Sequence, residues 1–133
     1  MNKEFVPYEE AFALKELGFN EPCLGYYICR NSAFGVDDLE ITTERIDLIR
    51  YDYASCVVPT FSQAFRWFRE KYKLFCWIEK FHVDETYIFQ IPPANFTKIQ
   101  GHYKTYEEAE LACLNKLIEI VKKITNNEHT SKF

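Results

Sequence analysis

A short pattern that starts helices occurs three times in this chain. An aromatic residue, a polar residue, Glu or Gln, and Ala follow one another at residues 8–11, 61–64 and 106–109. Each copy comes directly after a residue that favours a helix start: Pro7, Thr60 and Thr105. In the last two copies Thr stands three residues before Gln or Glu, which is the spacing of a capping box. The pattern therefore predicts three helix starts, and it supplies no chemistry at any of them.

The hydrophobic pattern extends these starts into elements. We expect helices over residues 8–17, 60–72 and 106–124, the first of them ended by Gly18. Runs rich in aromatic and β-branched residues predict strands over residues 24–29, 45–53, 74–82 and 85–91, with a short further strand at 96–103. Residues 31–44 have no clear period, and we interpret them as an irregular loop or a hairpin excursion.

These elements predict an α+β fold with the order α-β-β-α-β-β-α. Short connections between consecutive strands favour a mostly antiparallel sheet, packed with three helices. We expect a single domain over residues 1–124 and a frayed tail over 125–133. The repeated helix start suggests an internal duplication, and three similar capping sequences without shared ancestry explain it equally well.

Composition narrows the classes of function. The net charge is −4, which disfavours general attraction to nucleic acid, and 17% of residues are aromatic, which indicates a core of large side chains. The five cysteines are odd in number and contain no C-x-x-C, so we expect reduced, buried thiols and no metal site. No stretch approaches about 18 apolar residues and no apolar leader is evident, so we expect a cytoplasmic protein without a membrane contact.

Catalytic motifs are missing from the sequence. It contains no glycine-rich phosphate loop, no G-x-S-x-G and no H-E-x-x-H, and we expect no cofactor. Paired acids at 9–10 and 107–108 fit the first turn of a helix, where carboxylates complement the dipole. A cysteine nucleophile with His82 or His102 is the weakest alternative, because buried free cysteines are normally inert.

Two helix surfaces are candidate partner-binding sites. On the second helix Trp67 lies on the flank of the apolar face, with Arg66 and Arg69 on the opposite side, and Trp and Arg are enriched at binding hot spots. The alternative is that Trp67 packs under a neighbouring loop while the arginines are solvated. On the third helix Leu111 and Ile118 widen the apolar arc to about half the circumference, which favours a second layer or an oligomer interface.

The strand pair at residues 74–91 carries the other candidate surface. Trp77 and Tyr87 place rings on this hairpin, and such rings stack on single-stranded bases in other proteins. Basic residues outnumber acidic ones over residues 60–82. The rings form core more often, and the acidic balance of the chain opposes this interpretation.

Four segments, at residues 5–9, 14–19, 63–72 and 105–114, carry a resemblance to a known family. They resemble an uncharacterised family of small proteins from anaerobic gut bacteria, thought to travel with phages and other mobile elements. Residues 30–58 have no counterpart in it. The family has no established activity, cofactor or catalytic residue, so the resemblance implies only a bacterial, cytoplasmic, phage-related protein.

The sequence therefore favours a non-catalytic accessory module that binds a protein partner or a second copy of itself. A single-stranded nucleic-acid-binding protein is the first alternative, and a small enzyme with an unrecognised site is the second.

Overall fold

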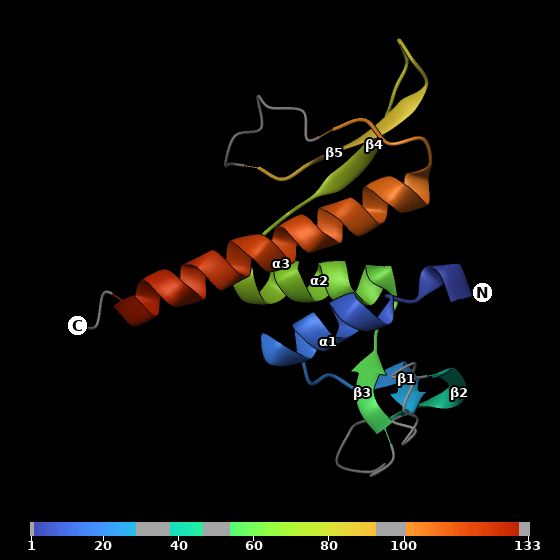
Figure 1. Cartoon of the computed structure of the whole chain (residues 1–133), viewed down its shortest axis with the longest axis vertical. Helices are drawn as coiled ribbons and strands as arrows, with labels where there is room; N and C mark the ends of the chain where they lie inside the picture. The colour runs from blue at the N-terminus through green and yellow to red at the C-terminus, as the bar shows by residue number, and fades with distance from the viewer. Residues whose placement is uncertain (1, 29–37, 47–53, 93–100, 131–133) are drawn as a thin grey trace, which may run out of the picture. The chain divides into compact units, whose positions relative to one another are not determined.

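The computed structural model describes residues 2–28, 38–46, 54–92 and 101–130, and it has the predicted α+β class (Figure 1). A short 3-10 turn, η1 (Asn2–Glu4), precedes helix α1 (Tyr8–Glu16), and the other helices are α2 (Phe61–Tyr72) and α3 (Tyr106–Thr130). The strands are β1 (Cys23–Ile28), β2 (Asp38–Ile46), β3 (Ala54–Val58), β4 (Trp77–Phe81) and β5 (Thr86–Gln90). The chain packs as two compact units, Met1–Gln63 and Ala64–Phe133, so the division falls inside α2.

The first unit is built on a three-stranded antiparallel sheet with the order β2-β1-β3. The N-terminal segment joins this sheet, because Phe5 forms an antiparallel bridge with Thr60 and the Val6 N–H donates to the Pro59 carbonyl over 3.0 Å. Gly25 lies where this segment crosses β1. A Cβ atom there would lie 2.9 Å from the Phe5 ring and 3.1 Å from the Val58 carbonyl, so only glycine fits without a shift.

Helix α1 ends as the sequence predicts. Gly18 adopts a φ of 99°, and the next residue, Phe19, donates its N–H to the Leu14 carbonyl over 2.9 Å. This is the Schellman arrangement, in which a left-handed residue returns the chain to the last turn of the helix. Phe19 and Leu14 are both buried, so the hydrophobic contact that accompanies the motif is available too.

The second unit contains the β4–β5 hairpin and α3. The hairpin pairs Trp77 with Gln90 at its open end and Phe81 with Thr86 at its turn. Tyr103 adds a single bridge on the far side of β5, where its N–H and carbonyl exchange hydrogen bonds with Tyr87 over 2.9 and 2.7 Å. Helix α3 runs along the hairpin and contacts both of its strands (Figure 1).

Both threonine caps form. The Gln63 N–H donates to Thr60 Oγ1 over 3.2 Å, and the Glu108 N–H donates to Thr105 Oγ1 over 3.1 Å. The returning bonds differ from the expected box. Glu108 accepts from the Lys104 N–H over 3.2 Å, and Gln63 Nε2 donates to the Pro22 carbonyl over 3.1 Å.

Three predicted segments need comment. The expected loop 31–44 is strand β2 from Asp38 onward, which agrees with the hairpin alternative. Ile41 pairs with Gly25 of β1, and Ile41, Thr42 and Thr43 are β-branched residues that favour strands. The expected strand 45–53 lies largely outside the described residues. Strand β3 follows it, so the described part of the chain has three strands between α1 and α2. The same limit applies to the strand at 96–103, of which only residues 101–103 are described.

The tail predicted to fray from residue 125 is helical as far as Thr130. Helix α3 continues past Ile124, and the Thr125 hydroxyl donates to the Val121 carbonyl one turn back over 2.9 Å. The continuing polar residues present no helix breaker, since the sequence has neither Gly nor Pro between residues 102 and 133.

Candidate partner-binding surface

Two large aromatic rings are half exposed at the start of β4: Phe75, two residues before the strand, and Trp77, its first residue. The side chains of Phe75 and Trp77 are 52% and 47% exposed. Their neighbours Leu74, Cys76 and Ile78 are half buried, so burial alternates with the period of two that an extended chain gives. Phe75 and Trp77 therefore lie on one face, which we call the ring face, and Cys76 and Ile78 lie on the other.

Basic residues surround this segment in the sequence. Arg69, Lys71, Lys73 and Lys80 are all exposed, and Glu70 and Glu79 are the exposed acids among them. Formal charge is distributed unevenly over the chain as a whole. Residues 1–63 hold five basic and eleven acidic side chains, a net −6, whereas residues 64–133 hold eleven and nine, a net +2. The ring face thus belongs to the basic unit of an acidic protein.

The predicted binding site on helix α2 is much less exposed than the ring face. Trp67 is only 6% exposed, and its ring packs edge-on against Phe68 and Tyr72 at centroid distances of 5.0 and 5.4 Å. Lys71 Nζ lies 5.1 Å from the centre of the same ring, a cation–π distance. Arg66 is half buried and Arg69 is exposed. The Trp67 ring therefore has little surface left to offer, and Arg69 is the most accessible member of the set.

The predicted helix α3 site is also mostly covered. Ile118 is 4% exposed and Leu111 is half buried, while Ile124, further along the helix, is exposed. The wide apolar arc is thus used chiefly within the chain, with the end of the helix as its accessible part.

The two predicted stacking residues do not share a face. Lys80 is the cross-strand partner of Tyr87, and it is three residues from Trp77, so Trp77 and Tyr87 point to opposite sides of the hairpin. The Tyr87 ring packs edge-on against Tyr106 of α3 at 6.0 Å. Trp77 and Tyr87 therefore cannot form one continuous platform for bases.

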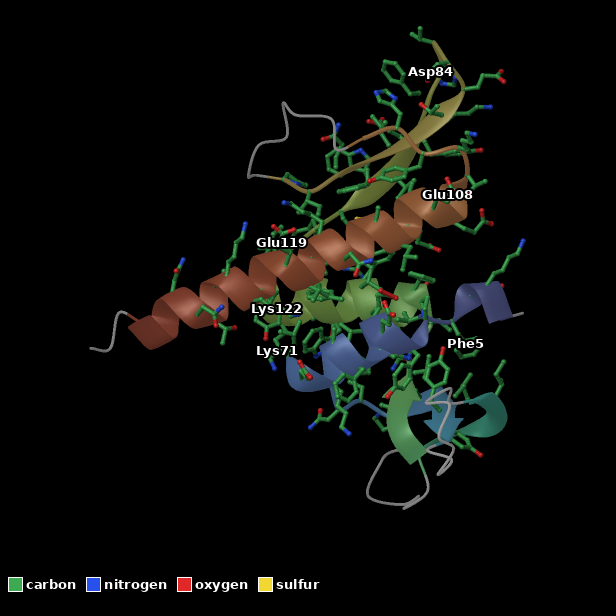
Figure 2. All side chains as sticks on the ribbon, viewed as in Figure 1. Phe5, Lys71, Asp84, Glu108, Glu119 and Lys122 are labelled. Atoms are coloured by element: carbon green, nitrogen blue, oxygen red, sulfur yellow. The ribbon has the colours of Figure 1, made fainter. Side chains whose placement is uncertain are left out.

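The turn of the hairpin gathers a polar cluster of Asp84, Thr86 and His102. Asp84 closes the turn as predicted, because its Oδ1 accepts from the Thr86 N–H over 3.2 Å and from the Thr86 hydroxyl over 2.6 Å. These bonds, the hydroxyl first, hold the pKa of Asp84 below its ordinary value, and the charge of His102 acts in the same direction. Figure 2 shows Asp84 at the tip of the hairpin, whereas Trp77 lies at its open end, where it pairs with Gln90.

This cluster has the residue types of a hydrolytic triad without its geometry. Thr86 Oγ1 lies 2.8 Å from His102 Nδ1, but Asp84 Oδ2 faces the same nitrogen at 3.6 Å. A triad aspartate holds the ring nitrogen opposite the nucleophile and is buried, whereas both Asp84 and His102 are exposed. The arrangement is that of a turn closure.

Metal binding and membrane insertion can be assessed for the part of the chain that the structure describes. There, no group of three His, Cys, Asp or Glu side chains comes together in a way that could hold a metal ion. The described helices also include none with the length and apolar character that a membrane span requires.

The sequence shows both rings on the hairpin, and of the two only Trp77 was predicted as a binding residue, for stacking on bases. The alternation of 74–78 is weak in the sequence, because all five residues are apolar or aromatic and both faces look covered. One side of the hairpin packs on α3, and this packing cannot be read from the strand sequence.

A scan against protein-family models and searches of curated proteins and of solved structures found no match to this chain.

Proposed function

We propose that this chain is a non-catalytic protein-binding module that contacts its partner through the ring face, Phe75 and Trp77. The observation that carries the proposal is the exposure of these two rings on an ordered hairpin, whose other face packs on α3. Aromatic side chains supply the largest apolar area for each residue ordered, and Trp is among the most frequent anchors of binding energy.

The charge around the ring face indicates the kind of partner. Lys71 and Lys73, which are exposed and precede the ring face in the sequence, favour a protein segment that presents apolar side chains flanked by carboxylates. A second copy of the chain meets this description in its net charge, because residues 1–63 carry a net −6. The resemblance to a mobile-element family supports a cytoplasmic accessory role alongside phage or mobile-element proteins.

Site-specific photo-crosslinking in cells tests the proposal directly. A benzophenone side chain replaces Trp77 in one variant and Val83 in the other. Val83 is a matched control, since it is 86% exposed and lies at the turn of the same hairpin. Irradiation of the Trp77 variant is expected to give one or a few discrete protein adducts that the Val83 variant lacks. Equal adducts at both positions, or none at 77, would contradict a docking role for the ring face.

Solution size separates self-association from binding to another protein. If the partner is a second copy, sedimentation velocity shows a dimer whose population grows with concentration, and Trp77→Ser abolishes it. Val83→Ser is the matched control, because Val83 is an exposed apolar residue at the turn of the hairpin and its loss should leave the dimer intact.

A single-stranded nucleic-acid ligand is the second candidate, favoured by the net +2 charge of residues 64–133. Fluorescence anisotropy with a labelled oligonucleotide should then show binding that weakens steeply with salt and is reduced by Lys73→Ala. Absence of binding at low salt removes this candidate and leaves the protein-binding proposal unaffected.

A further inference from the structure

Helix α1 presents an exposed aromatic ring between two carboxylates. The side chain of Phe12 is 40% exposed. Glu9 lies three residues before it and Glu16 four residues after it, spacings that place side chains on one side of a helix, and both glutamates are exposed. Tyr8 stacks on Phe12 with the ring centroids 6.1 Å apart, which widens the aromatic surface. We call these four residues the α1 face.

The charges beside the ring face and on the α1 face are opposite in sign. Exposed Lys71 and Lys73 precede the ring face, and their ammonium groups have neutral partners, two aromatic rings for Lys71 and the Glu70 carbonyl for Lys73. Glu9 and Glu16 form no ion pair within the part of the chain that the structure describes. All four charges are therefore open to a second molecule, and unlike charges across a contact favour its formation and fix its register.

One charge of the other sign stands on each face. Lys15 of α1 has its Nζ 6.0 Å from the centre of the Phe12 ring. Glu79 is exposed and lies two residues after Trp77, on the same side of β4. These minority charges are themselves opposite in sign, so the two faces are complementary in their minority charges as well.

Tyr106 offers a similar setting in the second unit. It is 45% exposed at the start of α3, with Glu107 beside it and Glu110 one turn further along. Its ring already packs edge-on against Tyr87 at a centroid distance of 6.0 Å. It also belongs to residues 64–133, which carry a net +2, whereas the α1 face belongs to residues 1–63, which carry a net −6. The α1 face is therefore the better match for a basic, aromatic surface.

We propose that the partner of the ring face is the α1 face of a second copy of this chain, so that copies associate head to tail. This inference rests on the proposed function, because it names the partner of the same site. Phe75 and Trp77 pack on Phe12, and the lysines and glutamates pair at the rim of the contact. The contact is heterologous, since each copy contributes two different surfaces to it.

Photo-crosslinking between two isotopic forms of the full chain tests which surface meets the ring face. Unlabelled protein with a benzophenone side chain at position 77 is mixed with isotopically heavy wild type, irradiated and digested with trypsin. Position 77 lies in peptide 74–80, Phe12 in peptide 4–15 and Tyr106 in peptide 105–116. We expect light peptide 74–80 joined to heavy peptide 4–15, a link that forms only between copies. Links to heavy peptide 105–116 or to other heavy peptides in its place, or no heavy adduct, would overturn the inference.

Charge reversal tests the paired residues. An affinity tag on the heavy copy isolates the mixed covalent dimer, which is quantified on a denaturing gel. Lys71→Glu with Lys73→Glu in the benzophenone copy is expected to lower the yield of this dimer about tenfold, because two exposed ion pairs become repulsive. Glu9→Lys with Glu16→Lys in the heavy copy should then restore the yield.

A control places the same charges elsewhere. Glu85→Lys with Glu107→Lys in the heavy copy reverses two exposed acids of the second unit and should not restore the yield. Equal rescue by both pairs of substitutions would show that only net charge matters and would overturn the assignment of the α1 face.

The inference and the proposed function can fail separately. Discrete adducts from position 77 in cells, with no heavy adduct in the purified protein, would overturn the pairing with the α1 face and leave a protein-binding ring face. Failure of both crosslinking experiments would remove the proposed function as well.

Discussion

Lys73 holds a backbone conformation that its side chain disfavours. It follows the last residue of α2 with a φ of 59°, and its Nζ donates to the Glu70 carbonyl over 3.1 Å. The left-handed conformation costs a residue with a Cβ about 1 kcal/mol relative to glycine. This strained residue lies between the end of α2 and the ring face.

We therefore expect Lys73→Gly to raise the free energy of unfolding by about 0.5–1 kcal/mol. Chemical denaturation followed by circular dichroism measures the change. Lys122→Gly is the matched control, since Lys122 is exposed inside α3 (Figure 2) and glycine there should cost about 1 kcal/mol. A loss of stability in both variants would show that the lysine contact outweighs the backbone strain.

The pKa values of two glutamates of α3 are shifted in opposite directions. Burial and the charge of Glu107 raise the pKa of Glu110, whereas bonds and charge from Lys123 and Lys116 lower the pKa of Glu119. A raised carboxyl pKa means that the folded state binds the proton more tightly than the unfolded chain. Ionised Glu110 therefore destabilises the fold, and this penalty appears as pH rises above the ordinary carboxyl pKa.

Glu110→Gln is accordingly expected to raise the melting temperature at pH 7 and to change it little at pH 3.5. Glu119→Gln should lower the melting temperature at pH 7. The favourable interaction of ionised Glu119 with the lysines is present above the ordinary carboxyl pKa and is lost as pH falls through the lower pKa of the folded state. Melting curves of both variants at the two pH values check the signs. An equal response of the two variants would contradict the assignment.

At the scale of elements, the close approach of the N-terminal segment to β1 depends on one residue. Gly25 has the Phe5 ring and the Val58 carbonyl within 3.1 Å of the place where a Cβ would stand. Gly25→Ala should destabilise the protein by about 1–3 kcal/mol, the usual cost of forcing an extra carbon into a packed site. Phe5→Leu in the same chain frees part of that space, so the double variant should lose less than the sum of the single variants. Strict additivity in denaturation would show that Phe5 is not what the new methyl group meets.

Which elements could be predicted follows from where their signals lie. Helix starts depend on local sequence. Thr60 and Thr105 each accept a hydrogen bond from the backbone N–H three residues later, and both bonds were predicted from this spacing alone. Strand β2 was left open between a loop and a hairpin, because its pairing with β1 depends on residues outside the strand and the β-branched run Ile41–Thr43 is short. The end of α3 was placed too early, since a polar sequence without glycine or proline extends a helix when nothing stops it.

The candidate site depended on packing even more than the strands did. Trp67 and Trp77 are equally good anchors by residue type, and the sequence ranked Trp67 first. Burial reversed this order, because Trp67 packs on Phe68 and Tyr72 whereas Trp77 stays half exposed.

At the scale of the whole molecule, one helix belongs to both units. The first residues of α2 complete the first unit, where Phe61 is buried and Gln63 bonds to the Pro22 carbonyl. The residues from Ala64 onward belong to the second unit, where Phe68 is fully buried. Because unfolding of α2 removes packing from each unit, we expect the two units to unfold together.

Hydrogen exchange with increasing urea, followed separately for α1 and α3, should give coincident transitions in the wild type. Arg66→Pro interrupts α2 next to the division between the units, at a cost of about 3 kcal/mol, and should separate the two transitions. Asn115→Pro is the matched control, because it breaks α3 at an exposed position inside one unit. It should lower both transitions and keep them together, since α2 is still continuous. Separate transitions already in the wild type, or coincident ones in Arg66→Pro, would show that the shared helix does not couple the units.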